Sequence, residues 1–312
     1  MQPKVYVLVL NYNGKQHLEY CLPSMAATQY DNCHIVLVDN GSTDGSLEFT
    51  RENFKDVIIL ENGANLVWAG GNNAGIKYAL ENGADYIVLQ NNDTKADPRW
   101  IAGAVEVCEN DPRIGIVGFT MLQEYIKGED PDEIRFKELS AAWEKLEYED
   151  APHVTGAAFF SRADVYRDLG LIDEAYFAYG EEDDMARRIK RAGYLQVRIN
   201  VPLWHYNGGY WSKRLWKSSW FAMRNTIRLI IKNESYSAGW QEIKEVIRFV
   251  CKPGVEFDPN IPHCLRMRPS NFMVNSLALG CAFLWNIFAL PATLSARRED
   301  ERRIDLVRKR WA

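Results

Sequence analysis

The sequence offers little for zinc binding or for disulfide bonds. Its six cysteines are scattered, and no two of them form a CxxC pair. This spacing argues against a zinc site and a dense disulfide framework, so we expect reduced and mostly buried thiols. Internal repeats and low-complexity tracts are also missing. With 47% hydrophobic, 12% aromatic and 25% charged residues, the 312-residue chain is typical of a globular protein rather than a disordered or fibrous one.

We also expect no secretory leader. The N-terminal apolar stretch, Val5–Leu10, is shorter than the core of a signal peptide, and no small-residue cleavage site follows it. We therefore expect a cytoplasmic protein. The length of the chain suits one large domain with an appendage or two smaller domains.

The whole chain lacks a strong charge, but its two parts do not. The net charge is −5. Residues 1–203 contain 19 Lys and Arg against 33 Asp and Glu, a net charge of −14, whereas residues 204–312 contain 18 against 9, a net charge of +9. A basic C-terminal part favours a partner that carries phosphate, a nucleic acid or an anionic membrane.

Strand-like apolar runs alternate with helical periodicity up to about residue 200. The expected strands are Val5–Leu10, His34–Val38, Val57–Leu60, Tyr86–Leu89, Ile114–Val117, His153–Ser161 and Leu195–Asn200. The expected helices are Gln16–Ala26, Ser46–Asn53, Asn73–Glu81, Pro98–Cys108, Ala163–Leu169 and Glu182–Ala192. This alternation predicts a parallel α/β sheet, in which ligands bind beyond the carboxyl ends of the strands.

Two regions depart from the alternation. Residues 124–151 are acidic and predict a loop or a small insertion with helical content. After Pro202 the chain is rich in Trp, Phe and Arg, and it predicts three helices, Arg214–Lys232, Gln241–Val250 and Asn271–Ala296.

Polar residues follow three of the expected strands. Asn11 ends the first strand and Asp39 the second, where Asp39 either shapes an ordinary turn or accepts hydrogen bonds from a nucleobase or ribose. Asp93 follows the fourth within Asn91-Asn92-Asp93-Thr94, where it either makes an Asx turn or joins Mg²⁺ or Mn²⁺ to two phosphates. His205 is either a partly buried imidazole or, if near Asp93, a second ligand of the cation.

Glycines and asparagines gather in the segment Asn65–Gly75, before the helix expected to start at Asn73. Glycine permits close approach of the backbone and a helix N-terminus favours an anion, so a diphosphate could lie here. The glycine spacing is not GxGxxG, which disfavours a dinucleotide-binding fold.

Four acids, Glu181 to Asp184, open an expected helix, and Arg187 and Arg188 follow. Acids at a helix N-terminus complement its dipole and can pair with these arginines. Four acids exceed what capping requires, however, and clustered like charges raise pKa values, as a general base requires.

In this order and spacing, the motifs resemble the family-2 glycosyltransferases with the GT-A fold, especially bacterial rhamnosyltransferase-like members. The resemblance covers about the first 230 residues, through Asn11–Gly14, Val38–Ser46, Asn65–Gly75, Leu89–Asp93, Gly156–Phe159, Phe177–Arg188, Trp204-His205 and Arg224-Asn225. It implies a mixed, mostly parallel sheet flanked by helices, with a C-terminal helical extension.

The resemblance also implies roles for single residues. Asn11 and Asp39 would hold the base and ribose, with Asn72, Asn73 and Asn92 as further nucleotide-binding residues. Asn91 replaces the first acid of the family's Asp-x-Asp motif, so Asp93 would be the main metal carboxylate and His205 a second ligand.

The acidic motif of the family supplies the general base. Asp184 and Arg188 set the register, which aligns Glu182 with the usual catalytic Asp and leaves Glu181 and Asp183 as alternatives. We count Glu182, Glu181 and Asp184 as candidate catalytic residues. Glu182 would deprotonate the acceptor hydroxyl while a divalent cation, Mg²⁺ or Mn²⁺, stabilises the leaving diphosphate, and the anomeric carbon would invert.

The basic C-terminal part is either a helical subdomain with a solvated basic face or a membrane-docking region. Tryptophans and basic residues alternate in it, at Trp204, Trp211, Trp216, Trp220 and Trp240 and at Lys213, Arg214, Lys217, Arg224 and Arg228. Tryptophan suits the bilayer interface, and basic residues attract anionic headgroups. Residues 270–296 are uncharged and long enough to span a bilayer, but Asn275, Asn286 and Pro291 favour a helix in the interface or one packed against another subunit.

Together these observations predict residues 1–205 as a GT-A catalytic domain and residues 206–312 as a region for acceptor or membrane docking. The predicted function is transfer of a sugar, L-rhamnose by resemblance, from a dTDP- or UDP-sugar to a lipid-linked or polysaccharide acceptor at the inner face of the cell membrane. We expect no nucleic-acid partner, and a homodimer is one option. The alternatives are a non-catalytic nucleotide-sugar binding module and a sugar nucleotidyltransferase, although the Arg-containing glycine-rich loop of the latter is missing after Leu10.

Overall fold

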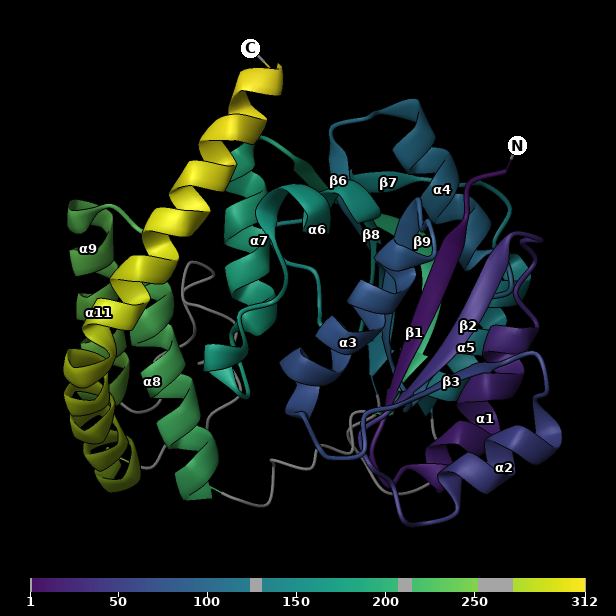
Figure 1. The fold of residues 1–312 in the computed structure, drawn as a ribbon, viewed down its shortest axis with the longest axis horizontal. Helices are drawn as coiled ribbons and strands as arrows, with labels where there is room; N and C mark the ends of the chain where they lie inside the picture. The colour runs from purple at the N-terminus through teal and green to yellow at the C-terminus, as the bar shows by residue number, and fades with distance from the viewer. Residues whose placement is uncertain (1, 124–130, 207–214, 252–271, 312) are drawn as a thin grey trace. The chain divides into compact units, whose positions relative to one another are not determined.

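The computed structural model describes residues 2–123, 131–206, 215–251 and 272–311. The chain divides into two compact units (Figure 1). Unit 1 contains residues 1–171 and 193–208, and unit 2 contains residues 172–192 and 209–312. The predicted boundary at residue 205 is close to one junction, but residues 172–192 belong with the C-terminal helices and not with the sheet.

Unit 1 is built on a nine-stranded mixed sheet. The strand order is β3-β2-β1-β4-β8-β6-β9-β5, and β7 pairs with β9. The strands are β1 (Val5–Asn11), β2 (Cys33–Asp39), β3 (Ile58–Glu61), β4 (Tyr86–Asn91), β5 (Thr94–Ala96), β6 (Ile114–Gln123), β7 (Tyr148–Asp150), β8 (Ala158–Arg162) and β9 (Leu195–His205). β1 to β4 are parallel to one another, whereas β8 is antiparallel to both β4 and β6. The predicted mixed sheet is therefore confirmed.

In the described part of unit 1, six α-helices accompany these strands. They are α1 (Lys15–Ala26), α2 (Ser46–Asn53), α3 (Val67–Glu81), α4 (Trp100–Asn110), α5 (Pro131–Ala142) and α6 (Ala163–Leu169). The core strand β1 is buried on both faces, from Val5 to Val9, as expected for a parallel strand covered by helices on each side. Asn11 is the last residue of β1 and lies at the carboxyl end of the strand.

One helix begins earlier than the sequence predicts. α3 starts at Val67 rather than at Asn73, so Gly71 and Gly75 lie inside it. A Cβ added at Gly71 would lie 2.5 Å from Leu10 Cδ1, and one added at Gly75 would lie 2.9 Å from Val38 Cγ2. These glycines let α3 pack closely on β1 and β2, and the predicted helix start at Asn73 is wrong. The N-terminus of α3 still lies within Asn65–Gly75, so a diphosphate beside this segment stays a prediction.

Other differences concern strand length. β8 begins at Ala158 instead of His153, β9 continues from the predicted end at Asn200 to His205, and the three-residue strands β5 and β7 escape the sequence pattern. The helical content expected in residues 124–151 is present as α5, while residues 124–130 lie outside the described part. Of the six cysteines, Cys21, Cys33, Cys108 and Cys281 are free thiols, as expected, and Cys264 lies outside the described residues.

Unit 2 is helical. It contains a short 3₁₀-helix (Glu174–Tyr176), α7 (Glu181–Ala192), α8 (Leu215–Asn233), α9 (Tyr236–Cys251) and α11 (Phe272–Trp311). Figure 1 shows α11 as one long helix beside α8. Their shared core contains Ala222, Met223, Ile227, Ile230, Val246, Val250, Ala278, Leu279 and Ala282. α11 is longer than the predicted Asn271–Ala296, and it is the one helix among the described residues long and apolar enough to cross a membrane.

Part of the predicted tryptophan-rich and basic stretch cannot be compared. Trp211, Lys213, Arg214 and Asn271 lie outside the described residues. Trp216 is exposed on α8, whereas Arg224 and Arg228 are buried in unit 2. Arg224 and Arg228 therefore do not belong to a solvated basic face.

Candidate functional site

Three of the predicted nucleotide-binding residues meet where parallel strands end. β1 and β2 are in register so that Asn11 lies beside Asp39. Asn11 is fully buried, and its Nδ2 donates to Asp39 Oδ1 at 3.1 Å. Asn92, which follows β4, donates from Nδ2 to Asn11 Oδ1 at 2.7 Å. The structure thus brings Asn11, Asp39 and Asn92 into one network, as their positions after neighbouring strands predict.

Gly14 makes room for this network. A Cβ added there would lie 2.1 Å from Asn92 Nδ2 and 2.7 Å from Asn11 Oδ1. Any larger residue at this position would push apart the two amides that hydrogen bond to each other. The network therefore depends on the glycine as much as on its polar members.

The Asp39 carboxylate shapes the loop after β2. Its Oδ2 accepts hydrogen bonds from the backbone N–H groups of Gly41 at 3.0 Å and Ser42 at 2.8 Å, and its Oδ1 accepts from Ser42 Oγ at 2.5 Å. With Asn11 as a further donor, both oxygens have protein partners. The turn role considered above is confirmed, and contact with a base or ribose stays a prediction.

Asn72 and Asn73 lie within α3 and are almost completely buried. Asn72 Nδ2 donates to the backbone oxygen of Trp68 at 3.0 Å, while its buried Oδ1 has no hydrogen-bond partner among the described residues. Trp68 Nε1 in turn donates to Asn91 Oδ1 at 3.2 Å. Asn91, which stands where the family has an acid, therefore ties α3 to the end of β4.

The predicted metal ligands Asp93 and His205 are neighbours. β5 pairs with β9 so that Thr94 lies opposite His205, and the backbone N–H of Tyr206 donates to the backbone oxygen of Asp93 at 3.0 Å. Asp93 Oδ1 lies 3.3 Å from His205 Nε2, and the two side chains are 19% and 10% exposed. The three-residue strand β5 makes this pairing, and the sequence contains no signal strong enough to predict so short a strand.

Histidines govern the ionisation of Asp93. Burial raises the pKa of its carboxyl, but the neighbouring His205 and His17 rings outweigh burial and keep the pKa below its usual value. Burial also lowers the pKa of His17 on α1, against the opposing effect of Asp93. Sequence reasoning missed His17, because a lone histidine on an expected helix is no signal by itself.

The pair fits a divalent cation. Buried Asp93 Oδ1 and His205 Nδ1 have no hydrogen-bond partner within the described ranges. Carboxylate oxygen and imidazole nitrogen are both donors that Mn²⁺ accepts, and such ions commonly take one or two protein ligands with phosphate and water completing the shell. The described residues contain no group of three or more His, Cys, Asp and Glu side chains placed to hold a metal. A cation here would therefore take its remaining ligands from water or from a bound phosphate group.

Four acids open α7 in unit 2, and their environments differ. Glu181 is 4% exposed and its Oε2 has no hydrogen-bond partner among the described residues. Burial, with a smaller contribution from Asp183 and an opposing one from Arg224, raises the pKa of Glu181 to about 7. Glu182 is partly exposed and Asp183 is buried. The predicted raised pKa is thus found at Glu181, but burial is its main cause, ahead of the like charge.

Asp184 is fully buried and fully bound. Its Oδ1 accepts from Tyr176 Oη at 3.1 Å and Asn233 Nδ2 at 2.9 Å, and its Oδ2 accepts from Arg188 Nε and Lys232 Nζ, both at 2.9 Å. Although burial opposes ionisation, Lys232 and Arg188 hold the pKa of Asp184 far below its usual value. Asp184 therefore anchors α7 by its four hydrogen bonds.

Lys232 extends this network beyond the motif. Its Nζ lies 3.0 Å from both Asp173 Oδ2 and Asp300 Oδ2, and Arg228 Nη2 lies 2.7 Å from Asp173 Oδ2. Asp300 comes from the second half of α11. Sequence reasoning missed Lys232 and Asp300, because nothing local distinguishes them from surface charges.

Asn225 fixes the backbone that leads into α7. Phe177, Tyr179 and Gly180 have φ values of 68°, 69° and 94°, which are unfavourable for the two non-glycine residues. Asn225 Nδ2 donates to the backbone oxygens of Tyr176 at 2.8 Å, Ala178 at 2.6 Å and Tyr179 at 2.6 Å. The Arg224-Asn225 motif thus has a structural role in unit 2: it holds a strained turn immediately before the acids.

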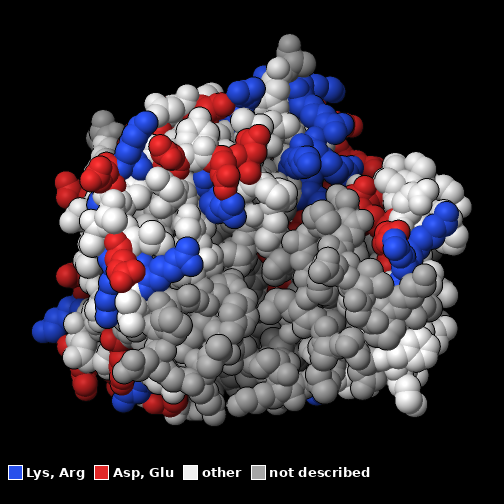
Figure 2. Space-filling model, turned by 180° about the vertical axis from the view of Figure 1, so that it is seen from behind, with Lys and Arg blue, Asp and Glu red and all other residues white. Residues whose placement is uncertain are grey.

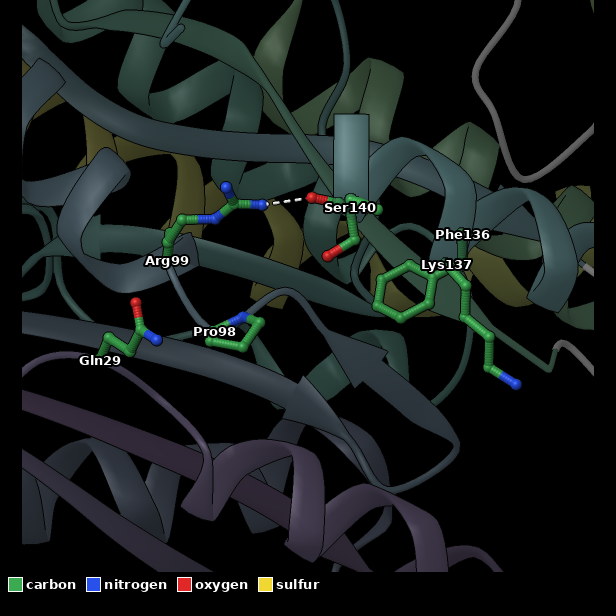
Figure 3. Close-up of a pocket in the computed structure, with 7 residues that line it drawn as sticks. Gln29, Pro98, Arg99, Phe136, Lys137 and Ser140 are labelled. Atoms are coloured by element: carbon green, nitrogen blue, oxygen red, sulfur yellow. Dashed lines mark hydrogen bonds between the residues drawn. The ribbon is translucent and has the colours of Figure 1, made fainter. Parts of the chain in front are cut away.

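A hollow of about 540 Å³ lies elsewhere in unit 1 (Figure 3). Its lining includes Pro98, Arg99, Lys137 and Ser140, and Arg99 Nη2 donates to the Ser140 backbone oxygen at 2.6 Å. None of the predicted site residues lines it. We therefore assign it no part of the candidate site.

Comparison with known sequences agrees with the motifs. The model of the family described as "Glycosyl transferase family 2" matches residues 6–170. A similar curated protein is N-acetylglucosaminyl-diphospho-decaprenol L-rhamnosyltransferase from Mycobacterium tuberculosis (strain ATCC 25618 / H37Rv). It is 25% identical over 229 residues, which is 62% of this chain and 72% of that protein.

Solved structures of similar fold are glycosyltransferases. The mannosyltransferase PcManGT from Pyrobaculum calidifontis, in complex with GDP-Man and Mn²⁺, has a TM-score of 0.55 and 17% identity, over 99% of this chain and 87% of that one. Residues 1–349 of TarS from S. aureus, in complex with UDP, have a TM-score of 0.58 and 15% identity, over 99% and 91% of the two chains. At these identities the likeness shows the fold.

Proposed function

Because this chain belongs to glycosyl transferase family 2 and is a glycosyltransferase of the GT-A fold, we propose that it moves a sugar from a nucleotide-diphosphate donor to an acceptor hydroxyl with inversion of the anomeric carbon. The family and fold predicted from the motifs are confirmed. Residues 1–205 supply the donor-binding sheet in this proposal, and residues 206–312 serve acceptor or membrane docking.

The Asp93–His205 pair carries the proposal. Asp93 Oδ1, which lies 3.3 Å from His205 Nε2, and the buried His205 Nδ1 suit a divalent cation, Mg²⁺ or Mn²⁺, whose shell phosphate and water oxygens would complete. Bound there, the cation would supply the positive charge that stabilises a departing diphosphate. Asp93 is held ionised by its histidine neighbours, so it can bind a cation at neutral pH.

The network at the carboxyl ends of β1, β2 and β4 would bind the nucleotide. Its members are the buried Asn11 and Asp39 and the partly exposed Asn92, and Asn72 and Asn73 are the further candidates on α3. Asp39 Oδ2 already accepts hydrogen bonds from the backbone of the loop after β2. We therefore propose that this loop contacts the nucleoside together with the Asp39 carboxylate.

The general base would come from the start of α7. We assign it to Glu182, which is partly exposed and can reach an acceptor hydroxyl, with buried Glu181 as the alternative. In the reaction, the base takes the proton of the acceptor hydroxyl as its oxygen bonds to the anomeric carbon and the bond to the diphosphate breaks. Asp184, whose oxygens are bound by four donors, positions α7 instead of reacting.

The mycobacterial relative, an N-acetylglucosaminyl-diphospho-decaprenol L-rhamnosyltransferase, supports a choice of donor and acceptor. We propose L-rhamnose from dTDP-rhamnose as the donor to test first, with UDP-sugars second. A lipid-linked or polysaccharide acceptor in cell-surface glycan biosynthesis would place the enzyme at the inner face of the cell membrane.

Release of nucleoside diphosphate from these donors tests the function. We expect release that requires Mn²⁺ or Mg²⁺, and we expect Asp93→Asn to slow it roughly a hundredfold, because a cation ligand is lost. Asp56→Asn, which removes an exposed carboxylate, is the matched control. Electron paramagnetic resonance of Mn²⁺ should show weaker binding in Asp93→Asn only.

A chain that binds donor but releases no diphosphate would be a binding module, and release of pyrophosphate from a sugar phosphate and a nucleoside triphosphate would identify a nucleotidyltransferase.

A comparison of Glu182→Gln with Glu181→Gln tests the base. Loss of turnover in Glu182→Gln with donor binding intact supports the assignment. Loss in Glu181→Gln alone, together with a rate in the unmodified enzyme that rises through about pH 7, would transfer the role to Glu181.

A further inference from the structure

Among the described residues, one face of the first half of α11 has no protein partner. Five large apolar side chains are exposed there, namely Met273 (80%), Leu277 (61%), Leu284 (60%), Ile287 (64%) and Phe288 (84%). They recur at helical spacing, so they share one side of the helix. Gly280 belongs to the same row, and a Cβ added to it would meet nothing within 4 Å. The face is therefore open as well as apolar.

The opposite face of the same segment is occupied. Ala278, Leu279 and Ala282 belong to the core of unit 2. Asn286 Nδ2, also buried, donates to the backbone oxygen of Arg224 at 2.9 Å. A helix that crossed a bilayer alone would expose the buried Asn286 amide to lipid as well. The structure therefore favours a helix with one apolar face turned outward over a helix that spans.

The open face changes from apolar to basic along the helix. Residues 272–296 contain no charged side chain, whereas residues 297–311 contain seven Arg and Lys against four Asp and Glu. Arg302 follows Leu284 by about five helical turns and so lies on the same side, as do Arg298 and Lys309. All three are exposed. Figure 2 shows the basic side chains gathered around the C-terminal end of α11 and uncharged side chains around its N-terminal end.

We propose that this face of α11 docks on an anionic bilayer, with residues 273–288 in the boundary between headgroups and acyl chains and with Arg298, Arg302 and Lys309 on the lipid phosphates. Interfacial helices combine an apolar face with basic residues in this way. The inference deepens the proposed function, on which it rests for the lipid-linked acceptor, since docking would confine the enzyme to the surface that contains that acceptor.

Charge distinguishes the bilayer from a second copy of the chain. A twofold interface places the same patch of both copies together. If two α11 helices met in parallel, basic ends would face each other, and if they met antiparallel, each basic end would face the apolar half of the other. An anionic bilayer matches both halves of the face at once.

Co-sedimentation of the full chain with vesicles tests the docking. We expect binding to phosphatidylglycerol vesicles at low salt, weaker binding at high salt, and little binding to phosphatidylcholine vesicles. Leu284→Glu/Ile287→Glu should weaken binding about tenfold or more, because it puts charge into the apolar face and repels anionic lipid. Gly280→Ala is the matched control on the same face and should bind as the unmodified chain does.

A second pair of variants tests the basic half. Arg298→Ala/Lys309→Ala should weaken binding at low salt about tenfold or more, since each basic residue near an anionic surface contributes. Lys55→Ala/Lys77→Ala removes the same charge from exposed positions of unit 1 and should change little. Equal loss in both double variants would overturn the proposal, because net charge would then explain the binding.

Three other outcomes would also overturn it. Failure of the unmodified chain to bind phosphatidylglycerol vesicles would do so, as would retention on membranes after alkaline carbonate, which marks a spanning helix. Conversion of a dimer into a monomer by Leu284→Glu/Ile287→Glu, with vesicle binding unchanged, would assign the face to a second copy. Nucleoside diphosphate release in vesicle-free solution should be equal in all these variants. Its absence from the unmodified chain, with vesicle binding intact, would refute the proposed function and leave the docking in place.

Discussion

Neighbouring carboxylates of α7 ionise very differently because their partners differ. Glu181 and Asp184 are both buried and stand one helical turn apart. Asp184 has two cations and two neutral donors at hydrogen-bond distance, so burial is outweighed and its pKa falls. Glu181 has an unpartnered oxygen, so burial dominates and its pKa rises to about 7. At the scale of single residues, hydrogen-bond partners decide the charge of each acid.

Glu181→Gln should change how stability depends on pH. The folded-state pKa of Glu181 is raised from 4.5 to about 7, so between these values the unfolded chain releases a proton that the folded chain retains. The native protein therefore loses stability as pH rises from about 5 to about 7. Gln resembles the protonated acid, so the variant does not undergo this loss. The free energy of unfolding of the variant minus that of the unmodified protein should therefore be larger at pH 8 than at pH 5, by on the order of 2 kcal/mol.

Urea unfolding of both proteins at pH 5 and pH 8 measures this difference. Glu299→Gln is a suitable control, because Glu299 is partly exposed on α11 and pairs with Arg303. A stability difference between Glu181→Gln and the unmodified protein that did not vary with pH would show that the Glu181 carboxyl has no raised pKa.

At the scale of helices, one lysine joins three segments of unit 2. Lys232 on α8 lies 2.9 to 3.0 Å from the carboxylates of Asp184 on α7, Asp300 on α11 and Asp173 before the 3₁₀-helix. Arg188 and Arg228 share these acids. Removing one cation from such a network leaves buried negative charge uncompensated, which costs more than the ion pair itself contributes.

Lys232→Met should therefore destabilise the protein strongly. We expect a loss of about 3 to 5 kcal/mol, because Asp173, Asp184 and Asp300 would share one cation fewer while all three stay buried. Lys217→Met changes an exposed lysine of the same helix, α8, and should cost less than about 0.5 kcal/mol. Denaturant unfolding at neutral pH measures both. Similar small losses in the two variants would mean that the network is not compensating the buried acids.

The packing of α3 on the sheet gives a second prediction at this scale. Gly75→Ala should destabilise by about 1 to 3 kcal/mol, because the new Cβ would lie 2.9 Å from Val38 Cγ2 and 3.0 Å from Leu8 Cδ1, both in a close-packed core. Gly280→Ala, in open space inside α11, should instead stabilise by up to about 1 kcal/mol through helix propensity. Thermal unfolding should give shifts of opposite sign, and two stabilised variants would contradict the close approach of α3.

At the scale of the whole molecule, the two units interlace in sequence. Residues 172–192, with the acidic motif, lie between strands β8 and β9 of unit 1 but belong to unit 2. The partners of Asp184 and Arg188 in that unit, Lys232 and Asp300, come later in the chain. A cut after the last strand therefore separates α7 from the residues that hold it.

A chain ending at residue 208 should consequently lose activity although it contains every motif of the predicted catalytic domain. We expect nucleoside diphosphate release to fall to background, while nucleotide binding to the β1, β2 and β4 edge is kept if the sheet folds. Circular dichroism and a nucleotide-binding titration should accompany the assay. Full release by the truncated chain would show that α7 needs no support from α8 and α11.

The sequence alone determines the sheet, the order of the motifs and the family. Period-2 and period-3.6 patterns are local, so strands such as Val5–Asn11 and helices such as Ser46–Asn53 can be read from neighbouring residues. Asn11, Asp39 and Asn92 meet as predicted, because parallel strands end at one edge.

Only the tertiary structure decides what the local pattern leaves open. The start of α3 depends on how closely glycines approach β1 and β2, and the Asp93–His205 pair depends on a three-residue strand, β5, that pairs with β9. The ionisation of Asp184 in α7 depends on Lys232, 48 positions later in the chain. Burial and charge are sums over neighbours in space, so a sequence window can name the ionisable groups but cannot set their pKa values.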